Sequence, residues 1–299
     1  MVGLDTSHVP AFANLLHDAS HEYHVPGGRI VAAVPGGSPD FALSIDRVDK
    51  FTAELRDRHG VEIVATVAEL RGKCDAIMLE SIDGRVHLEQ FREIADWQIP
   101  VFIDKPLAIS SSDAAEILRI ARQKQVRVTS SSAIRFAESF QTALLEEAAG
   151  PIIGGDFYGP MAFQNECPGY FWYGIHSAEM LFATMGADCK EVMAIRNEQH
   201  DIVIGRWADD RLGVLRGNRE GNSRFGGTIH RKTGSTGFQI APGSKPFYAS
   251  LLERIIPYFQ GQANVVELNE MHAVVGFLEA ANHSATQGGW QKLPTEPSA

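Results

Sequence analysis

Short apolar runs alternate with amphipathic stretches over the first 130 residues. The runs are continuous and rich in Val, Ile, Phe and Ala, which is typical of strands buried on both faces of a parallel sheet. They lie at residues 29–34, 61–64, 74–79, 101–105 and 126–129. Helical spacing of apolar residues occurs between them, at residues 49–59, 87–97 and 112–123. This alternation predicts βαβ units and a doubly wound parallel sheet of the α/β class, in a first domain over residues 1–130.

The pattern changes after residue 130. Helical spacing is found at residues 140–149, 175–185, 245–259 and 267–285. A strand-like segment covers 152–158, and several more lie between 190 and 240, joined by turns that contain Gly, Asn and Asp. These features predict a second, α+β domain over residues 131–299, with an open and largely antiparallel sheet.

Composition excludes several classes of protein. The 299 residues carry a formal net charge of −10 with no block of basic residues, so no nucleic-acid partner is expected. No apolar run approaches membrane-spanning length and no basic-then-apolar leader opens the chain, so no membrane association is expected. The three cysteines, Cys74, Cys167 and Cys189, are far apart, which fits neither a disulfide framework nor a zinc module and favours a cytoplasmic protein.

The opening residues look like a phosphate-binding loop between a strand and a helix. Gly3 is followed by a polar turn, and Thr6 or Ser7 is placed to cap the helix. In a dinucleotide fingerprint Gly-x-Gly-x-x-Gly, Asp5 takes the second glycine position and His8 the third. A carboxylate at the second position would tend to repel a pyrophosphate. We nevertheless expect this loop to contact the cofactor.

Only Val2 remains of the strand that normally precedes such a loop. In a doubly wound sheet this first strand is central and has neighbours on both sides. The sequence therefore predicts a slot in the core at this point, and we expect the true start of the chain to lie upstream of Met1.

The end of the second predicted strand leaves the choice of cofactor open. An NAD-selective site usually has Asp or Glu here and an NADP site has an Arg nearby, but this chain has Gly37, Ser38 and Pro39. We expect Ser38 to lie at the cofactor.

His17, His21 and His24 fall at i, i+4 and i+7, a spacing that places imidazoles on one helical face. Zinc would need a further ligand and tight geometry. We interpret them as the polar end of the first helix and predict no metal site.

The apolar run from Val101 delivers Asp104 and Lys105 to the carboxyl end of its strand, and Pro106 ends it. In open α/β sheets that edge binds ligands. A lysine there can hydrogen-bond a substrate hydroxyl while that carbon becomes a carbonyl. The alternative is a solvated lysine at a strand end.

Four features, in chain order, resemble the glucose-fructose oxidoreductase/inositol dehydrogenase (Gfo/Idh/MocA) family. They are Asp104-Lys105-Pro106 at a strand end, Ile134-Arg135-Phe136 with a helix and residues 150–154 behind it, Gly174-Ile175-His176 with Leu181, and the closing segment from Asn269-Glu270 to Leu293-Pro294. The family's Glu-Lys-Pro strand end has Asp104 in place of the glutamate here.

The resemblance implies a Rossmann domain that holds NAD or NADP, and hydride transfer between the nicotinamide and a sugar- or polyol-like substrate. By position, Lys105 would polarise the reacting hydroxyl and His176 would take its proton. The second domain's open sheet implies a homo-oligomer. The residues expected at the cofactor are Gly3, Asp5, Thr6, Ser7, His8, Ser38, Asp104 and Lys105.

Some positions depart from the family pattern. Many relatives have an Asp four residues before the catalytic histidine, where this chain has Trp172. Glu179, one helical turn after His176, is the candidate to orient the imidazole instead, or is a solvated helix residue. Arg135, Trp172 and Tyr173 are assigned to substrate binding, although core packing is the commoner fate of an aromatic cluster.

Two hypotheses follow. The first is an NAD(P)-dependent oxidoreductase that acts on CH–OH groups. The second is a non-catalytic binding or regulatory protein that keeps the dehydrogenase fold, which Asp5, His8 and Trp172 favour. Binding of NADH or NADPH distinguishes them.

Overall fold

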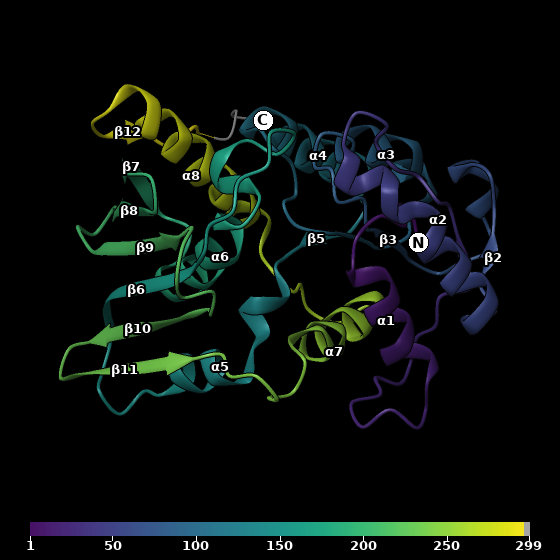
Figure 1. Ribbon diagram of the computed structural model, residues 1–299, viewed down its shortest axis with the longest axis horizontal. Helices are drawn as coiled ribbons and strands as arrows, with labels where there is room; N and C mark the ends of the chain where they lie inside the picture. Colours follow the sequence, from purple (N-terminus) through teal and green to yellow (C-terminus); the bar gives the residue numbers. More distant parts are fainter. Residues whose placement is uncertain (296–299) are drawn as a thin grey trace.

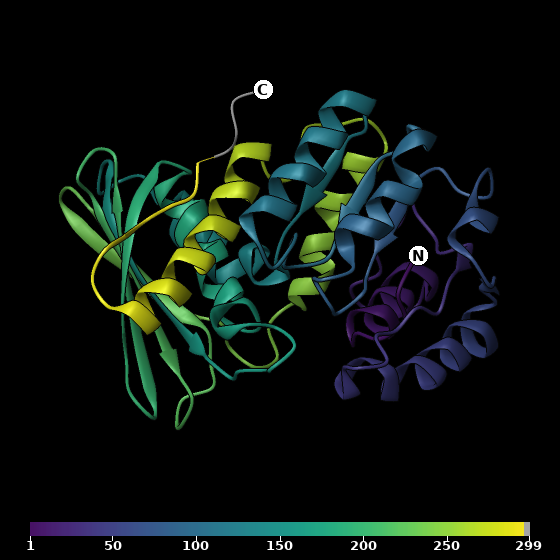
Figure 2. The same ribbon diagram turned by 90° about the horizontal axis from the view of Figure 1, so that it is seen from above.

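The structure, a computed structural model, describes residues 1–295 and consists of two lobes side by side (Figure 1). The first lobe contains a parallel sheet between helices, and the second is a broad sheet with helices on one face (Figure 2). Buried apolar side chains such as Ile103, Phe157 and Phe277 belong to one continuous core that joins the lobes. The predicted domain boundary near residue 130 stays a prediction.

Five short parallel strands build the first lobe. They are β1 (Ala32–Ala33), β2 (Glu62–Ile63), β3 (Ile77–Leu79), β4 (Val101–Ile103) and β5 (Val128–Ser130). Strand β1 pairs with β2, and β4 lies between β3 and β5. Val2 bridges the two groups by pairing with Val34 and Leu79, both in parallel. The order β2-β1-Val2-β3-β4-β5 confirms the predicted doubly wound sheet.

The connecting helices are α1 (His8–His17), α2 (Ala42–His59), α3 (His87–Ile94) and α4 (Ser111–Lys124), with short 3₁₀ turns η1 (Val67–Leu70), η2 (Ala95–Trp97) and η3 (Ala133–Phe136). Helix α2 begins seven residues before the predicted start at residue 49. Its first turn exposes Ala42 and Ile45 and buries Ser44, so apolar spacing does not mark the buried face there. The buried side chain of Phe41, just before the helix, fixes the earlier start.

An open pocket of about 1010 Å³ lies beside Met1, between the amino ends of β1 and β3. The Met1 ammonium donates to the carbonyl of Ala32 at its edge. Ile30, Met78 and Ile256 of α7 (Phe247–Phe259) contribute to its wall. Ligands in this fold class bind at the carboxyl ends of the strands, so this cavity is not the candidate site.

The second lobe is a mixed sheet. Its strands are β6 (Ile152–Pro160), β7 (Cys189–Arg196), β8 (His200–Trp207), β9 (Leu212–Asn218), β10 (Gly226–Arg231), β11 (Gly234–Gln239) and β12 (Gln291–Lys292), in the order β11-β10-β6-β9-β8-β7-β12. Every pair is antiparallel except β6 with β9. This agrees with the predicted open, largely antiparallel sheet.

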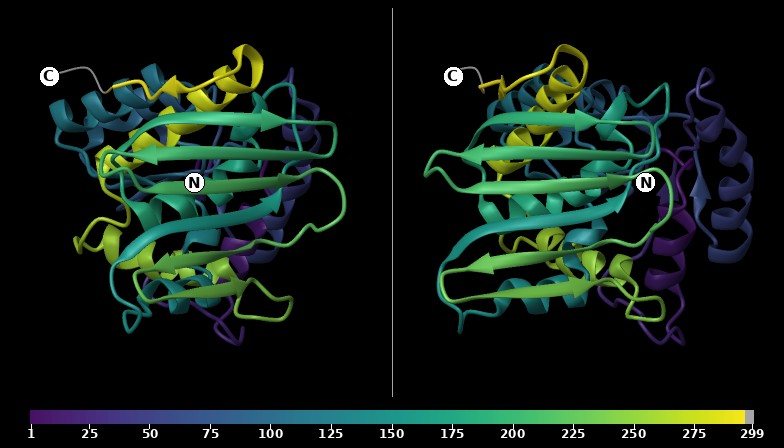
Figure 3. Two further views of the ribbon diagram at one scale, coloured as in Figure 1. Left: turned by 90° about the vertical axis from the view of Figure 1, so that its left-hand side faces the viewer. Right: turned by 60° about the vertical axis from the view of Figure 1, so that its left-hand side comes forward.

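One face of this sheet carries helices and the other does not (Figure 3). The remaining helical segments are α5 (Glu138–Leu145), η4 (Gly169–Phe171), α6 (Gly174–Met185) and α8 (Leu268–Gln287). Ile153, Ile195 and Leu212, on three of the strands, are each at least half exposed. Apolar side chains of this kind suit the predicted homo-oligomer contact, which stays a prediction.

Within residues 1–295, no helix combines the length and the apolar character that a membrane span requires.

Candidate active site

Lys105 is held at the carboxyl end of β4 by its neighbours. Its backbone N–H donates to Oδ1 of Asp104 at 2.8 Å, and both residues are less than a tenth exposed. The Lys105 ammonium lies 5.6 Å from the centroid of the Trp172 ring, which reaches it from the second lobe. The β4 strand thus presents an ammonium group where the two lobes meet.

His176 is the third residue of α6 and comes from the second lobe. Its Nδ1 lies 2.6 Å from Oγ of Ser132, in the segment that follows β5. Burial first, and then the positive charge of Lys105, hold the pKa of His176 well below its ordinary value. The Lys105 ammonium lies against Trp172, and the adjacent Tyr173 ring lies against His176, so the amine and the imidazole border one pair of rings.

Aromatic side chains flank both groups. Besides its contact with Lys105, Trp172 lies 5.8 Å from the ring of Phe41 in the first lobe. The Tyr173 ring lies 5.7 Å from that of His176. Trp172 and Tyr173 both stay partly exposed, in contrast to the buried Phe41. Partly exposed rings beside reactive groups are suited to contact the apolar face of a ring-shaped substrate.

Ser132, rather than Glu179, is the hydrogen-bond partner of His176. The Glu179 carboxylate lies 3.3 Å from both Arg135 and Oγ of Ser131. Sequence reasoning missed Ser132, although a run of serines after a strand was a signal for polar groups at the sheet edge. The catalytic role assigned to Glu179 stays a prediction, but its contacts do not include the imidazole.

Arg135 is buried and engaged in ion pairs. Besides Glu179, its guanidinium binds Glu270 of α8, with Nη1 at 2.7 Å. These contacts tie η3 to α6 and α8. The predicted role in substrate binding stays a prediction, and the geometry favours a structural role.

His87 also escaped sequence reasoning. Its imidazole lies between the carbonyls of Ser81 and Pro106, at 2.8 and 3.0 Å. It therefore clamps the loop after β3 to the loop after β4 and fixes the position of Lys105.

The opening loop packs closely against its neighbours. A Cβ on Gly3, which has φ +85°, would lie 2.3 Å from Oγ of Ser81, so only glycine fits. Asp5 is fully buried, and its carboxylate accepts from the Ile82 N–H at 2.9 Å and the Ser44 hydroxyl at 2.5 Å. The expected repulsion of a pyrophosphate is thus reduced, because this side chain turns inward and burial raises its pKa.

The other residues expected at the cofactor lie along the same sheet edge. Ser7 is the N-cap of α1 but makes no side-chain cap bond, and the Thr6 hydroxyl accepts from the His8 N–H instead. Ser38, after β1, donates to Asp83 at 2.6 Å. An inward Asp5 and the N-terminus of an α-helix above a parallel strand fit a dinucleotide phosphate group.

The three histidines at the end of α1 have separate partners. Nε2 of His17 accepts from the Ile30 N–H, Nδ1 of His21 accepts from the Tyr23 N–H, and Nδ1 of His24 lies 3.0 Å from the Leu15 carbonyl. They do not form a common ligand set.

We expect Ser132→Ala to lower kcat by about fivefold, because loss of one oriented hydrogen bond costs about 1 kcal/mol and leaves the imidazole free to rotate. Ser131→Ala is the matched control, since its hydroxyl does not touch His176. Ser132→Thr, which keeps the hydroxyl, should restore most of the rate. An unchanged kcat in Ser132→Ala would contradict this positioning role.

The comparisons with known proteins agree with this geometry. Residues 27–132 match the model of the Gfo/Idh/MocA family, described as an oxidoreductase family with an NAD-binding Rossmann fold. None of the curated protein sequences matches the chain. The fold of the whole chain is that of solved dehydrogenases, at identities too low to carry more than the fold.

Two such structures illustrate the likeness. A putative myo-inositol dehydrogenase from Sinorhizobium meliloti is 16% identical, with a TM-score of 0.76 and 98% of each chain covered. The myo-inositol dehydrogenase from Lactobacillus casei, solved with NAD(H) and myo-inositol, is 12% identical, with a TM-score of 0.75 and 100% of this chain and 97% of that one covered. Residues 27–132 therefore match the NAD-binding Rossmann domain of the Gfo/Idh/MocA oxidoreductase family, in agreement with the family, the fold class and the NAD(P)-dependent enzyme class expected from the motifs of the chain.

Proposed function

We propose that the protein oxidises a hydroxyl carbon of a sugar- or polyol-like substrate, or reduces the corresponding carbonyl, with NAD. The observation that carries the proposal is that Lys105, from the first lobe, and His176, from the second, contact one pair of adjacent rings, Trp172 and Tyr173. Burial, and then the charge of Lys105, lower the pKa of His176, which agrees with both groups acting on one region at the carboxyl edge of the sheet. The partly exposed rings of Trp172 and Tyr173 border it.

Each residue has one task in the oxidation. Bound NAD⁺ would accept the hydride that leaves the substrate carbon. The Lys105 ammonium donates a hydrogen bond to the reacting hydroxyl oxygen, and His176 takes the hydroxyl proton on Nε2 as the carbonyl forms. That role requires the neutral imidazole to carry its proton on Nδ1, where Ser132 Oγ accepts it. The low pKa of His176 keeps the imidazole neutral and ready to accept.

The pH dependence follows from this assignment. The reactive form of His176 is the neutral one, and its pKa lies well below 6.5 because of burial, Lys105 and His8, with Asp104 opposing them. We therefore expect kcat/KM for oxidation to stay level down to about pH 6.5, the ordinary histidine pKa, and to fall only in more acidic solution. Initial rates across that range test it. A fall centred near the ordinary histidine pKa would contradict the assignment.

The test of the function is a nicotinamide titration followed by a substrate screen. We expect NADH fluorescence to rise or shift saturably on addition of protein, and NAD⁺ to be reduced in the presence of at least one polyol or sugar. The matched binding control is Gly3→Val, which places a side chain against Ser81 and should disturb the loop. The absence of both NADH and NADPH binding would instead support a non-catalytic binding protein.

A further inference from the structure

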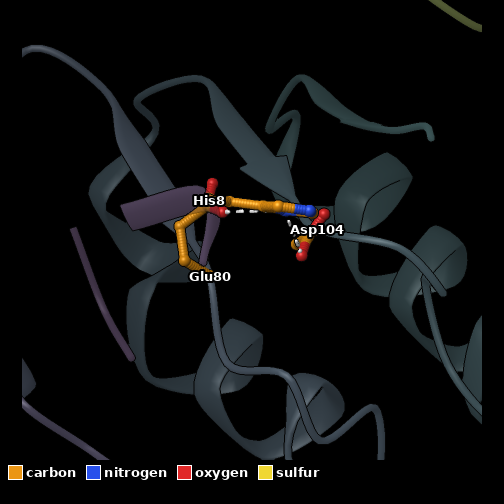
Figure 4. A group of neighbouring side chains, drawn as sticks. All are labelled: His8, Glu80 and Asp104. Carbon is orange, nitrogen blue, oxygen red and sulfur yellow. Dashed lines mark ion pairs between the residues drawn. The ribbon is translucent and has the colours of Figure 1, made fainter. Parts of the chain in front are cut away.

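Three side chains of different elements converge at the carboxyl ends of neighbouring strands (Figure 4). His8 is the first residue of α1, Glu80 follows β3 and Asp104 follows β4. One potential ligand atom from each lies within 4.8 Å of the other two. All three are buried, with relative exposures of 7%, 0% and 1%. Nothing in the sequence spacing linked them, because they are 72 and 24 residues apart.

The polar atoms of this cluster lack ordinary partners. Within residues 1–295, neither carboxylate oxygen of Glu80 has a hydrogen-bond partner. His8 and Asp104 form an ion pair, with Nδ1 2.8 Å from Oδ2, although the contact lacks the angles of a hydrogen bond. Glu80 itself comes no closer to His8 than 3.9 Å. Buried polar atoms normally have hydrogen-bond partners. Leaving one unsatisfied costs about 1–3 kcal/mol, and more when the group is charged.

A proton on Glu80 would not resolve this arrangement. Protonation removes the charge of Glu80 but adds an O–H that itself needs an acceptor at a fully buried position. A cation between the three groups satisfies all of them at once. Two carboxylates and a neutral imidazole around a divalent ion also sum to zero charge, which suits a buried position.

We propose that His8, Glu80 and Asp104 bind a divalent transition-metal ion. One imidazole nitrogen and two carboxylate oxygens form a mixed ligand set that suits Mn²⁺, Fe²⁺ or Zn²⁺ better than Ca²⁺, which takes six to eight oxygens. Three protein ligands leave coordination positions for water or another small ligand.

The backbone holds these ligands in place. The Glu80 N–H donates to the Val2 carbonyl at 2.7 Å, and the Asp104 N–H donates to the Leu79 carbonyl at 2.8 Å. Two of the three ligands are therefore fixed by the parallel sheet, as a preorganised site requires. The metal site lies beside Lys105, which follows Asp104 directly, but it does not depend on the dehydrogenase proposal.

The experiment measures metal binding on the full chain without nucleotide or substrate. After removal of metals with EDTA and dialysis, Mn²⁺ is titrated while the free ion is followed by electron paramagnetic resonance, and melting temperature is recorded in parallel. We expect saturable binding of one Mn²⁺ per chain, a rise in melting temperature and displacement of Mn²⁺ by Zn²⁺.

Substitutions identify the ligands. Glu80→Gln keeps the shape of the side chain and should weaken Mn²⁺ binding more than about tenfold. Asp104→Asn keeps Oδ1 as the acceptor for the Lys105 N–H and should weaken Mn²⁺ binding to a similar extent. It replaces Glu80→Gln as the test if that variant fails to fold. Asp83→Asn is the matched control, because this buried acid has its own partners in Ser38 and Arg85 and should bind Mn²⁺ as the parent does.

Two results would overturn the metal site. One is the absence of saturable Mn²⁺ and Zn²⁺ binding by the parent protein. The other is unchanged Mn²⁺ affinity in Glu80→Gln and Asp104→Asn. A separate titration with NADH in EDTA distinguishes this inference from the proposed function. NADH binding in EDTA, together with no saturable Mn²⁺ binding in the metal titration, overturns the metal site and leaves the dehydrogenase proposal standing.

Discussion

Lys105→Met and His176→Asn are each expected to lower kcat for NAD-dependent oxidation by at least about 100-fold, the lower range for loss of a positioned acid–base group. Methionine retains the length of the lysine stem, so packing against Trp172 is largely kept while the ammonium is lost. Asparagine keeps a polar group near Ser132 without an acid–base imidazole. Circular dichroism and melting temperature establish that each variant is folded before its rate is measured.

A matched control accompanies each variant. Lys124→Met removes an exposed lysine that pairs with Asp96 on the surface, and His230→Asn removes a partly exposed histidine of the second lobe. Both should keep the parent rate. If Lys105 and His176 serve one proton transfer, the double variant should lose little more than the worse single variant. Parent-like rates in folded Lys105→Met and His176→Asn would remove the catalytic assignment.

The sequence indicated the strand end and the helix start because each has a local signature. Asp104-Lys105-Pro106 follows an apolar run and ends it with two charges and a proline, and Gly174-Ile175-His176 begins a helix. Such signals depend only on neighbours along the chain. They therefore predicted which elements carry Lys105 and His176, and the parallel order of the strands followed from the βαβ alternation.

Other features depend on contacts between distant segments and had no local signal. Ser132 acquires its partner only when the segment after β5 meets α6. The direction of the Asp5 carboxylate is decided by Ser44 and Ile82, which are 39 and 77 residues away. Glu80 reads as the polar residue that ends a strand, and only the fold brings it beside His8. Long-range pairing of this kind is what a single sequence leaves open.

Charge gives the cofactor region an unusual character. Asp5, Glu80 and Asp104 all lie at the sheet edge where the family places its dinucleotide, and all three are buried. Burial raises the pKa of Asp5, and its carboxylate points inward to Ser44 and Ile82. A cation at His8, Glu80 and Asp104 would offset the other two charges. The inward Asp5 and the proposed metal ion would both reduce the repulsion of a pyrophosphate at this edge.

Arg135→Met is expected to lower the free energy of unfolding by about 3–5 kcal/mol, the usual cost of removing one partner from a buried ion pair. The guanidinium lies between Glu179 and Glu270 and is 6% exposed. Its loss leaves carboxylates of α6 and α8 close together without a counter-charge. Urea unfolding followed by circular dichroism measures the effect.

The control is an ion pair at the surface. Arg92 pairs with Glu89 and Glu116 while remaining 44% exposed, so Arg92→Met should cost less than about 1 kcal/mol. Adding Glu179→Gln to Arg135→Met should recover part of the lost stability, because it removes one of the unpaired charges. A substrate-binding role for Arg135 predicts the opposite profile, with unchanged unfolding and a raised KM.

The pH dependence of this loss has a defined sign. Burial already raises the pKa of Glu179 in the parent protein, although Arg135 opposes the shift. Without Arg135 the pKa of Glu179 in the folded state rises further above its value in the unfolded chain. The contribution of Glu179 to stability is therefore fully present below its unfolded pKa and is lost as pH rises through its folded pKa. The deficit of Arg135→Met relative to the parent should therefore be smaller near pH ~5 than near pH ~8, within the range where a buried glutamate titrates. A deficit that grows toward acidic pH would show that the carboxylates are not the source of the instability.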